Sequence, residues 1–156
     1  MAMDTMLATN ADAQLILKLY ELRTEQGLRS ARKWIGEEFW PTTAEEFFAV
    51  WHASGTEHNA YLRQVLSYWE MAGSFVLHGA LDADLFFDCN GENLFLLAKF
   101  HFLLGEIRKQ APGFLKNTEE LTRRFPAEGL RLERMIEKME LRREKMELRR
   151  AAPAHQ

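Results

Sequence analysis

Apolar residues recur at intervals of three and four along almost the whole chain, and this period limits most strongly what the chain can fold into. Tyr61, Val65 and Tyr68, for example, fall on one face of a helix predicted over residues 57–77. Alternation of apolar and polar residues, the period of a half-buried strand, is almost absent. The pattern therefore predicts an all-α fold, a compact bundle of about six helices followed by one long C-terminal helix.

Local signals place several helix ends. Thr43 stands three residues before Glu46, the capping-box spacing that opens a helix. Thr24 is a plausible opening cap of an earlier helix, Gly79 fits the left-handed position after a helix, and Asp82 is placed to cap the next one. One continuous helix is expected over residues 92–108.

No long Gly/Ser-rich linker divides the chain into two domains. We therefore expect a helical core domain over residues 1–126, a long charged helix over residues 127–150 and a disordered tail over residues 151–156. The 11 Phe and 4 Trp residues supply the large side chains of a core, so a disulfide or metal is not needed for stability.

The expected location is the cytoplasm. The single cysteine, Cys89, cannot form an intramolecular disulfide, which suits a reducing compartment. The N-terminal stretch has no positive charge before Lys18 and lacks the pattern of a secretory signal. The longest apolar stretch, Leu94 to Leu104, is broken by Lys99 and His101 and is far shorter than the roughly 20 residues of a membrane-spanning helix. We expect no contact with a membrane.

The charges are unevenly distributed along the chain. Residues 1–129 carry 12 basic and 18 acidic side chains, whereas residues 130–150 carry 8 basic and 5 acidic ones. Binding to a nucleic-acid backbone relies on dense Lys and Arg, which an acidic body with a mildly basic tail does not offer. Nucleic acid is therefore not an expected partner.

The motifs of common metal and catalytic sites are missing. A carboxylate-bridged di-iron bundle needs Glu-x-x-His on two helices, and a thiolate-rich zinc site needs several cysteines. Asp82, Asp84 and Asp88 suggest a calcium loop, but Phe86 stands where the next oxygen ligand should fall. No nucleophile elbow, phosphate-binding loop or dinucleotide fingerprint is present. The sequence predicts no catalytic residue, metal or cofactor and favours a non-enzymatic role.

The polar segment from His78 to Glu92 is the first place to expect a ligand pocket, because it lies at the junction of three predicted helices. The alternative is that the same side chains have a purely structural role as helix caps. Glu70 lies either at the edge of an apolar stripe or buried with a partner, where it could act as an acid or base. The candidate ligand-binding residues are Trp69, Glu70, His78, Asp82, Asp88, Glu92 and His101.

Several short words in the middle of the chain resemble a known family. They are Tyr68-Trp69-Glu70-Met71-Ala72, His78-Gly79-Ala80, Leu85-Phe86-Phe87-Asp88, Gly91-Glu92 and Phe114-Leu115-Lys116-Asn117. In order and separation they are similar to a family of bacterial helical proteins known as a domain of unknown function, over about residues 12–125. The resemblance implies an all-helical fold and a bacterial source, and it carries no activity or catalytic residue.

The C-terminal segment repeats itself after seven residues. Lys138-Met139-Glu140-Leu141-Arg142-Arg143 is followed by Lys145-Met146-Glu147-Leu148-Arg149-Arg150. A seven-residue repeat keeps each kind of side chain on a nearly fixed helical face. The glutamates form one stripe and the basic residues another, with an apolar seam between them made of Leu132, Met135, Ile136, Met139 and Met146.

This pattern favours parallel self-association of the C-terminal helix. With the seam at the core of a coiled coil, Arg142 of one chain faces Glu147 of a parallel partner, whereas an antiparallel pair opposes like charges. The expected interaction residues are Leu132, Ile136, Met139, Met146, Arg142 and Glu147. Because Arg143 and Arg150 interrupt the seam, two alternatives stay open: a solvated helix whose first turns dock on the body, and a helix that binds a different protein.

Two hypotheses about function follow. The leading one is a non-enzymatic helical interaction or scaffold protein that self-associates or docks a partner through its C-terminal helix. The alternative is a small-ligand-binding protein or enzyme with a pocket at the His78–Glu92 junction. A partner or ligand is not identified by the sequence.

Overall fold

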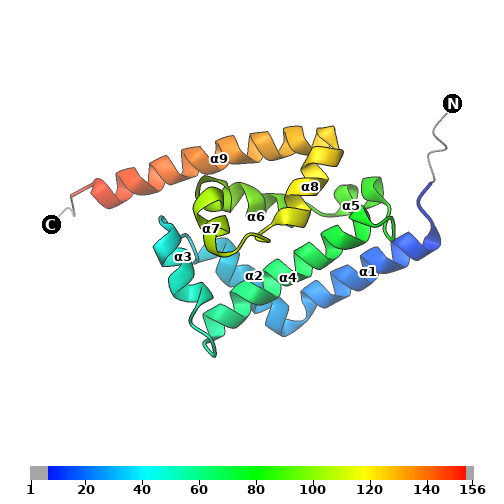
Figure 1. The fold of residues 1–156 in the computed structure, drawn as a ribbon, viewed down its shortest axis with the longest axis horizontal. Helices are drawn as coiled ribbons and strands as arrows, with labels where there is room; N and C mark the ends of the chain where they lie inside the picture. The colour runs from blue at the N-terminus through cyan, green and yellow to red at the C-terminus, as the bar shows by residue number, and fades with distance from the viewer. Residues whose placement is uncertain (1–6, 154–156) are drawn as a thin grey trace.

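The computed structural model describes residues 7–153, and these form nine α-helices and one short 3₁₀-helix without a strand (Figure 1). The predicted all-α class and the long C-terminal helix are confirmed. The helices are α1 (Asn10–Thr24), α2 (Gln26–Glu37), α3 (Ala44–Trp51), α4 (Glu57–Leu77), α5 (Ala83–Cys89), α6 (Glu92–Phe100), the 3₁₀-helix η1 (His101–Leu103), α7 (Leu104–Gln110), α8 (Lys116–Arg124) and α9 (Pro126–Ala151).

The helices are arranged around α4 and α6. The long helix α4 packs against α2, α3 and α8, and α9 packs along α6 and against α8. Figure 1 shows α9 running along one long side of the molecule, while α1 and α4 lie toward the opposite side. The C-terminal helix is therefore part of the packed molecule.

The centre of the core is aromatic. The Phe47 side chain has no exposed surface, and its ring centroid lies 5.6 Å from that of Phe100 and 5.2 Å from that of Phe114, both edge to face. Such pairs contribute about 0.5–1.5 kcal/mol beyond the burial of their area. The core of large side chains that the composition predicts is present.

Several predicted helix ends are confirmed. Gly79 has a φ of 74°, the left-handed conformation predicted after α4. Asp82 caps α5 by accepting a hydrogen bond of 2.8 Å from the backbone of its first turn. Thr43 caps α3 by accepting from the Glu46 backbone, but the Glu46 carboxylate accepts from Thr42 instead of Thr43. The predicted capping box is thus only half formed.

Two predicted boundaries are wrong. Thr24 is the last residue of α1 and does not open α2, because its hydroxyl donates back to the Glu21 carbonyl. The single helix expected over residues 92–108 is interrupted by η1, where the chain tightens to three residues per turn. The tightening leaves Phe102 38% exposed while its neighbour Leu103 is buried. The apolar run gives no sign of this break, because both helix types keep apolar residues three or four positions apart.

The helix α9 docks on the body through the apolar seam that the heptad repeat predicts. Met139 is buried, and the seam residues Leu132, Met135, Ile136 and Met146 are half-buried. Contact extends well beyond the first turns of the helix. Pairing of two chains through this seam stays a prediction, and it would require α9 to leave the body. Residues 154–156 of the predicted disordered tail lie outside the described residues.

Candidate functional site

The polar residues predicted near the His78–Glu92 junction are dispersed in the fold. His78 ends α4 with its ring exposed, and His78 Nδ1 lies 2.8 Å from the Ser74 carbonyl oxygen. Asp82 is occupied as the cap of α5, whereas Asp88 and His101 are exposed to solvent. The main cavities of residues 7–153 are lined by other side chains. These four residues are not brought together into one site.

Trp69 and Glu92 do meet, in a polar cluster with Arg32. The Arg32 guanidinium donates to both Glu92 oxygens, with a shortest distance of 2.6 Å, and Trp69 Nε1 donates to Glu92 Oε1 at 3.0 Å. The hydrogen bond to Glu92 raises the pKa of Arg32. Because both carboxylate oxygens already have partners, the cluster ties α2, α4 and α6 together and offers no free group.

Glu70 is half-buried, and both of its carboxylate oxygens accept hydrogen bonds. Its carboxylate accepts hydrogen bonds from the Asn117 backbone at 2.8 Å, the Thr118 backbone at 3.1 Å and the Thr118 hydroxyl at 2.9 Å. These donors belong to the first turn of α8, whose first N–H groups lack partners within the helix. Glu70 therefore caps α8 from the neighbouring helix α4.

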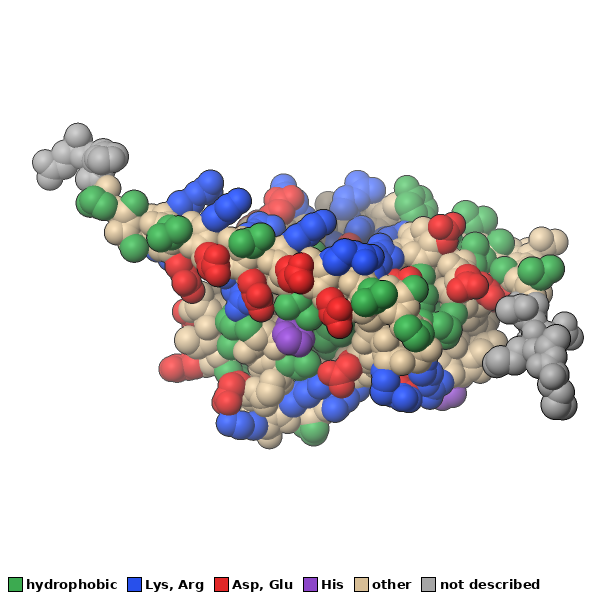
Figure 2. Space-filling model, turned by 90° about the horizontal axis from the view of Figure 1, so that it is seen from above, with side chains coloured by type: hydrophobic (Ala, Val, Ile, Leu, Met, Phe, Trp, Pro, Cys, Tyr) green, Lys and Arg blue, Asp and Glu red, His purple; other side chains and the backbone are tan. Residues whose placement is uncertain are grey.

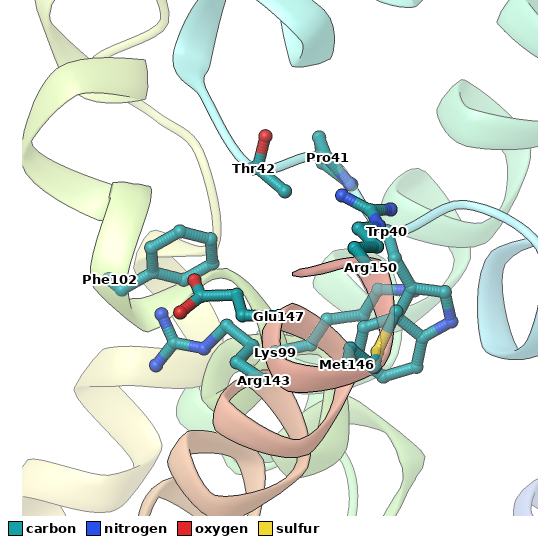
Figure 3. Close-up of a pocket in the computed structure, with 9 residues that line it drawn as sticks. All are labelled: Trp40, Pro41, Thr42, Lys99, Phe102, Arg143, Met146, Glu147 and Arg150. Atoms are coloured by element: carbon teal, nitrogen blue, oxygen red, sulfur yellow. The ribbon is translucent and has the colours of Figure 1, made fainter. Parts of the chain in front are cut away.

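A cavity of about 290 Å³ lies between α9 and the segment that follows α2, a position that the sequence analysis did not predict (Figure 3). In Figure 3 Phe102 and Trp40 stand on opposite sides of this pocket, with α9 side chains between them. The pocket joins segments far apart in the chain. Its lining residues are Trp40, Pro41, Thr42, Lys99, Phe102, Arg143, Met146, Glu147 and Arg150.

Cations stack on both aromatic walls of the pocket. Lys99 Nζ lies 3.9 Å and Arg142 Cζ 4.0 Å from the centroid of the Trp40 ring. Arg143 Cζ lies 3.7 Å from the centroid of the Phe102 ring. Each cation–π contact is worth roughly 0.5–1 kcal/mol at an exposed site and more when water is excluded. The contacts hold the C-terminal half of α9 on the body and place arginines at the pocket.

Lys99 is a buried amine inside this arrangement. The residue is 3% exposed, and its amine donates a hydrogen bond to the Ile35 carbonyl in the last turn of α2. Carbonyl groups at a helix end lack partners within the helix, so this lysine satisfies one of them. Burial, together with the smaller effect of the positive charge of Arg142, lowers the pKa of Lys99 to about 7. Near neutral pH the amine is therefore divided between its charged and neutral forms.

Comparison with known proteins gives the family. Residues 8–125 match a family described as Domain of unknown function (DUF4760). The chain belongs to this family. No curated protein and no solved structure matches it. The predicted resemblance is thereby confirmed, while the bacterial source that it implies stays a prediction.

The pocket is shared between the DUF4760 domain and the helix that follows it. The domain spans α1 to α8 and supplies Trp40, Lys99 and Phe102, whereas Arg143 and Arg150 come from α9, beyond the matched residues. The chain therefore completes the pocket with a segment outside the family match.

The sequence does carry weak signals of this pocket. Lys99 is a charged residue within the most apolar segment, and Arg143 and Arg150 are charged residues within the apolar seam of the heptad repeat. In the sequence each of these residues is an isolated interruption of an apolar pattern, because the pattern does not show which distant residues lie close together in the fold. In this DUF4760 structure all three line the same cavity.

Residues 7–153, which the structure describes, contain neither a cluster of metal ligands nor a membrane-spanning helix. Within residues 7–153 no group of three or more His, Cys, Asp or Glu side chains is placed to hold a metal ion. In the same range no helix is both long and apolar enough to cross a membrane.

Proposed function

We propose that this DUF4760 protein binds a small organic anion in the pocket between Trp40, Phe102 and α9. The observation that carries the proposal is the charge of the lining, in which Lys99, Arg143 and Arg150 are accompanied by a single carboxylate, Glu147. Ligand pockets typically combine apolar walls with a few polar groups and enclose roughly 300–1,000 Å³. A cavity of about 290 Å³ accepts only a small molecule.

The donors and rings of the pocket suit a carboxylate or phosphate attached to a flat apolar body. Arg143 lines the pocket, and its buried Nε has no hydrogen-bond partner among residues 7–153, so its guanidinium is not already committed to another group of the described chain. Guanidinium groups bind carboxylate and phosphate through parallel hydrogen bonds. The aromatic walls would contact the apolar part of the same ligand.

Titration calorimetry with benzoate and phenyl phosphate tests this proposal. We expect both anions to bind the wild-type protein and Arg143→Ala to weaken binding about 10- to 100-fold, because a hydrogen bond to a charged group contributes about 1.5–3 kcal/mol. Arg149→Ala is the matched control, since Arg149 is an exposed arginine of the same helix that does not line the pocket. Equal losses in the two variants, or no binding to the wild type, would contradict the proposal.

A second candidate function, an interaction through α9, is favoured by the outward face of that helix. Figure 2 shows an acidic row and a basic row along opposite sides of α9 with apolar side chains between them. Leu130 and Leu141 are each 57% exposed, and Leu148 is 71% exposed. An exposed apolar row with charged flanks is typical of a helix that docks on a partner. The interaction surface proposed for this helical protein is therefore the outward face of α9 and not the seam, which packs on the body.

Light-scattering mass measurements test the second candidate. We expect the full-length chain to be an oligomer and the double variant Leu141→Glu/Leu148→Glu to be a monomer, because charge on the outward face opposes close apposition. The variant leaves the seam and its contacts with the body intact. A monomeric wild-type protein would contradict self-association and leave only a different protein as the partner of α9.

A further inference from the structure

We propose that Lys99 is a covalent attachment point in the pocket, where its amine forms an imine with a small aldehyde or ketone that also carries an anionic group. The inference rests on the proposed function, because the same pocket must hold the anionic part of the ligand. The inference specifies that the anionic ligand expected there also contains a reactive carbonyl group.

The surroundings of the amine assign its bonding directions. A neutral amine has two N–H groups and one lone pair. One N–H is donated to the Ile35 carbonyl, and the face of the Trp40 ring, 3.9 Å from Lys99 Nζ, is an acceptor for the second. The remaining tetrahedral position is then that of the lone pair, which is the nucleophile. Lys99 is one of the residues that line the cavity (Figure 3), and the proposal requires that the lone pair of its amine face the ligand there.

Only Lys99 among the lysines of the chain has such surroundings. The other six lysines are Lys18, Lys33, Lys109, Lys116, Lys138 and Lys145, and all of them are exposed. An exposed lysine is charged at neutral pH and has no lone pair to offer. Buried lysines with a lowered pKa are the ones that form imines in proteins. The pKa of about 7 of Lys99, due first to burial and then to Arg142, leaves much of the amine neutral.

The charged side chains around Lys99 support both parts of the reaction. Arg142 shares the Trp40 ring with Lys99, and Arg143 and Arg150 line the cavity, with Glu147 as the one carboxylate among the lining residues. The positive charge of Arg142 opposes protonation of the amine, and the arginines that line the cavity attract the anionic group of the ligand. The carbonyl carbon and the anion can thus be held at the same time.

The reaction balances without an oxidant or reductant. The lone pair of Lys99 Nζ adds to the carbonyl carbon, and the electron pair of the C=O double bond moves to oxygen, which takes up one of the two Nζ protons. The hydroxyl group so formed then leaves with the second Nζ proton as one water molecule, and the C=N bond forms. Hydrolysis by the reverse route releases the ligand, so the attachment is reversible.

Trapping with 4-carboxybenzaldehyde tests this inference on the full chain at pH 7. Cyanoborohydride reduces any imine to a stable secondary amine, and peptide mass spectrometry then locates it. We expect Lys99 to be labelled at least tenfold faster than any exposed lysine, and benzaldehyde, which lacks the carboxylate, to label it more slowly. Labelling spread evenly over the lysines would overturn the inference.

Variants separate this inference from the proposed function. Arg143→Ala keeps the amine and should slow labelling of Lys99, whereas Lys33→Met should leave it unchanged. Excess benzoate should protect Lys99 in the wild-type protein. If benzoate binds by calorimetry but Lys99 is not labelled, the covalent step is wrong and the anion site stands. If benzoate does not bind and Lys99 is not labelled, both are wrong.

Discussion

Raising the pH from 7 to 9 should stabilise the wild-type protein by about 2 kcal/mol relative to a Lys99→Met variant. The pKa of Lys99 is about 7 in the folded protein, against an ordinary value of 10.5 that applies to the unfolded chain. Between these values the unfolded state binds more protons than the folded state, so the free energy of unfolding rises with pH. Below pH 7 the folded state must bury a charged amine, and the full cost of that burial is present.

Urea unfolding at pH 6, 7, 8 and 9, followed by tryptophan fluorescence, measures the effect for both proteins. Lys99→Met keeps a long flexible stem and removes only the amine. Loss of the hydrogen bond to the Ile35 carbonyl adds an offset that is nearly the same at every pH. A free-energy difference that does not change between pH 6 and pH 9 would contradict the lowered pKa.

The same burial links this pH dependence to the imine inference. A lysine that is costly to keep charged is one that supplies a neutral nucleophile near neutral pH. The stability measurement does not need a ligand, so it tests the state of the amine separately from the affinity of the pocket. If the free energy of unfolding depends on pH as expected but the aldehyde does not label Lys99, the role of Lys99 is limited to its hydrogen bond with the Ile35 carbonyl of α2.

Local pattern was sufficient for the elements whose shape depends on near neighbours. The long helices α4 and α9, the left-handed Gly79 and the Asp82 cap follow from the spacing of apolar residues and from cap chemistry within four residues. The interruption at η1 was not predictable in this way. It depends on how the chain packs around Phe100 and Phe102, which the apolar run does not encode.

The candidate site was less predictable because it depends on which distant segments meet. Glu70 and Glu92 stand out in the sequence as carboxylates near apolar positions, but their partners Thr118 and Arg32 are 48 and 60 residues away. The heptad seam poses the same difficulty, since an apolar stripe is equally suited to a second chain and to the protein's own body. Only the fold distinguishes the two uses.

Glu70→Ala should lower the free energy of unfolding by about 3 kcal/mol. The substitution leaves two backbone N–H groups of α8 and the buried Thr118 hydroxyl without their acceptor, and each unpaired buried donor costs about 1–3 kcal/mol. The residue before α8, Leu115, has a φ of 53°, a conformation that costs a non-glycine residue about 1 kcal/mol. The cap helps to hold the chain in that conformation, so its loss affects the whole start of the helix.

Urea unfolding of matched variants decides whether Glu70 is this cap. Glu70→Gln keeps one acceptor oxygen and should lose less than Glu70→Ala. Glu106→Ala removes an exposed carboxylate of α7 that pairs with Lys109 at 2.8 Å, and such surface pairs are worth about 0–1 kcal/mol. If Glu70→Ala costs no more than Glu106→Ala, the carboxylate is not needed to start α8. Glu70 would then be available to the cavity of about 390 Å³ that it lines with Trp51 and Arg63, and a ligand role for it would be the next one to test.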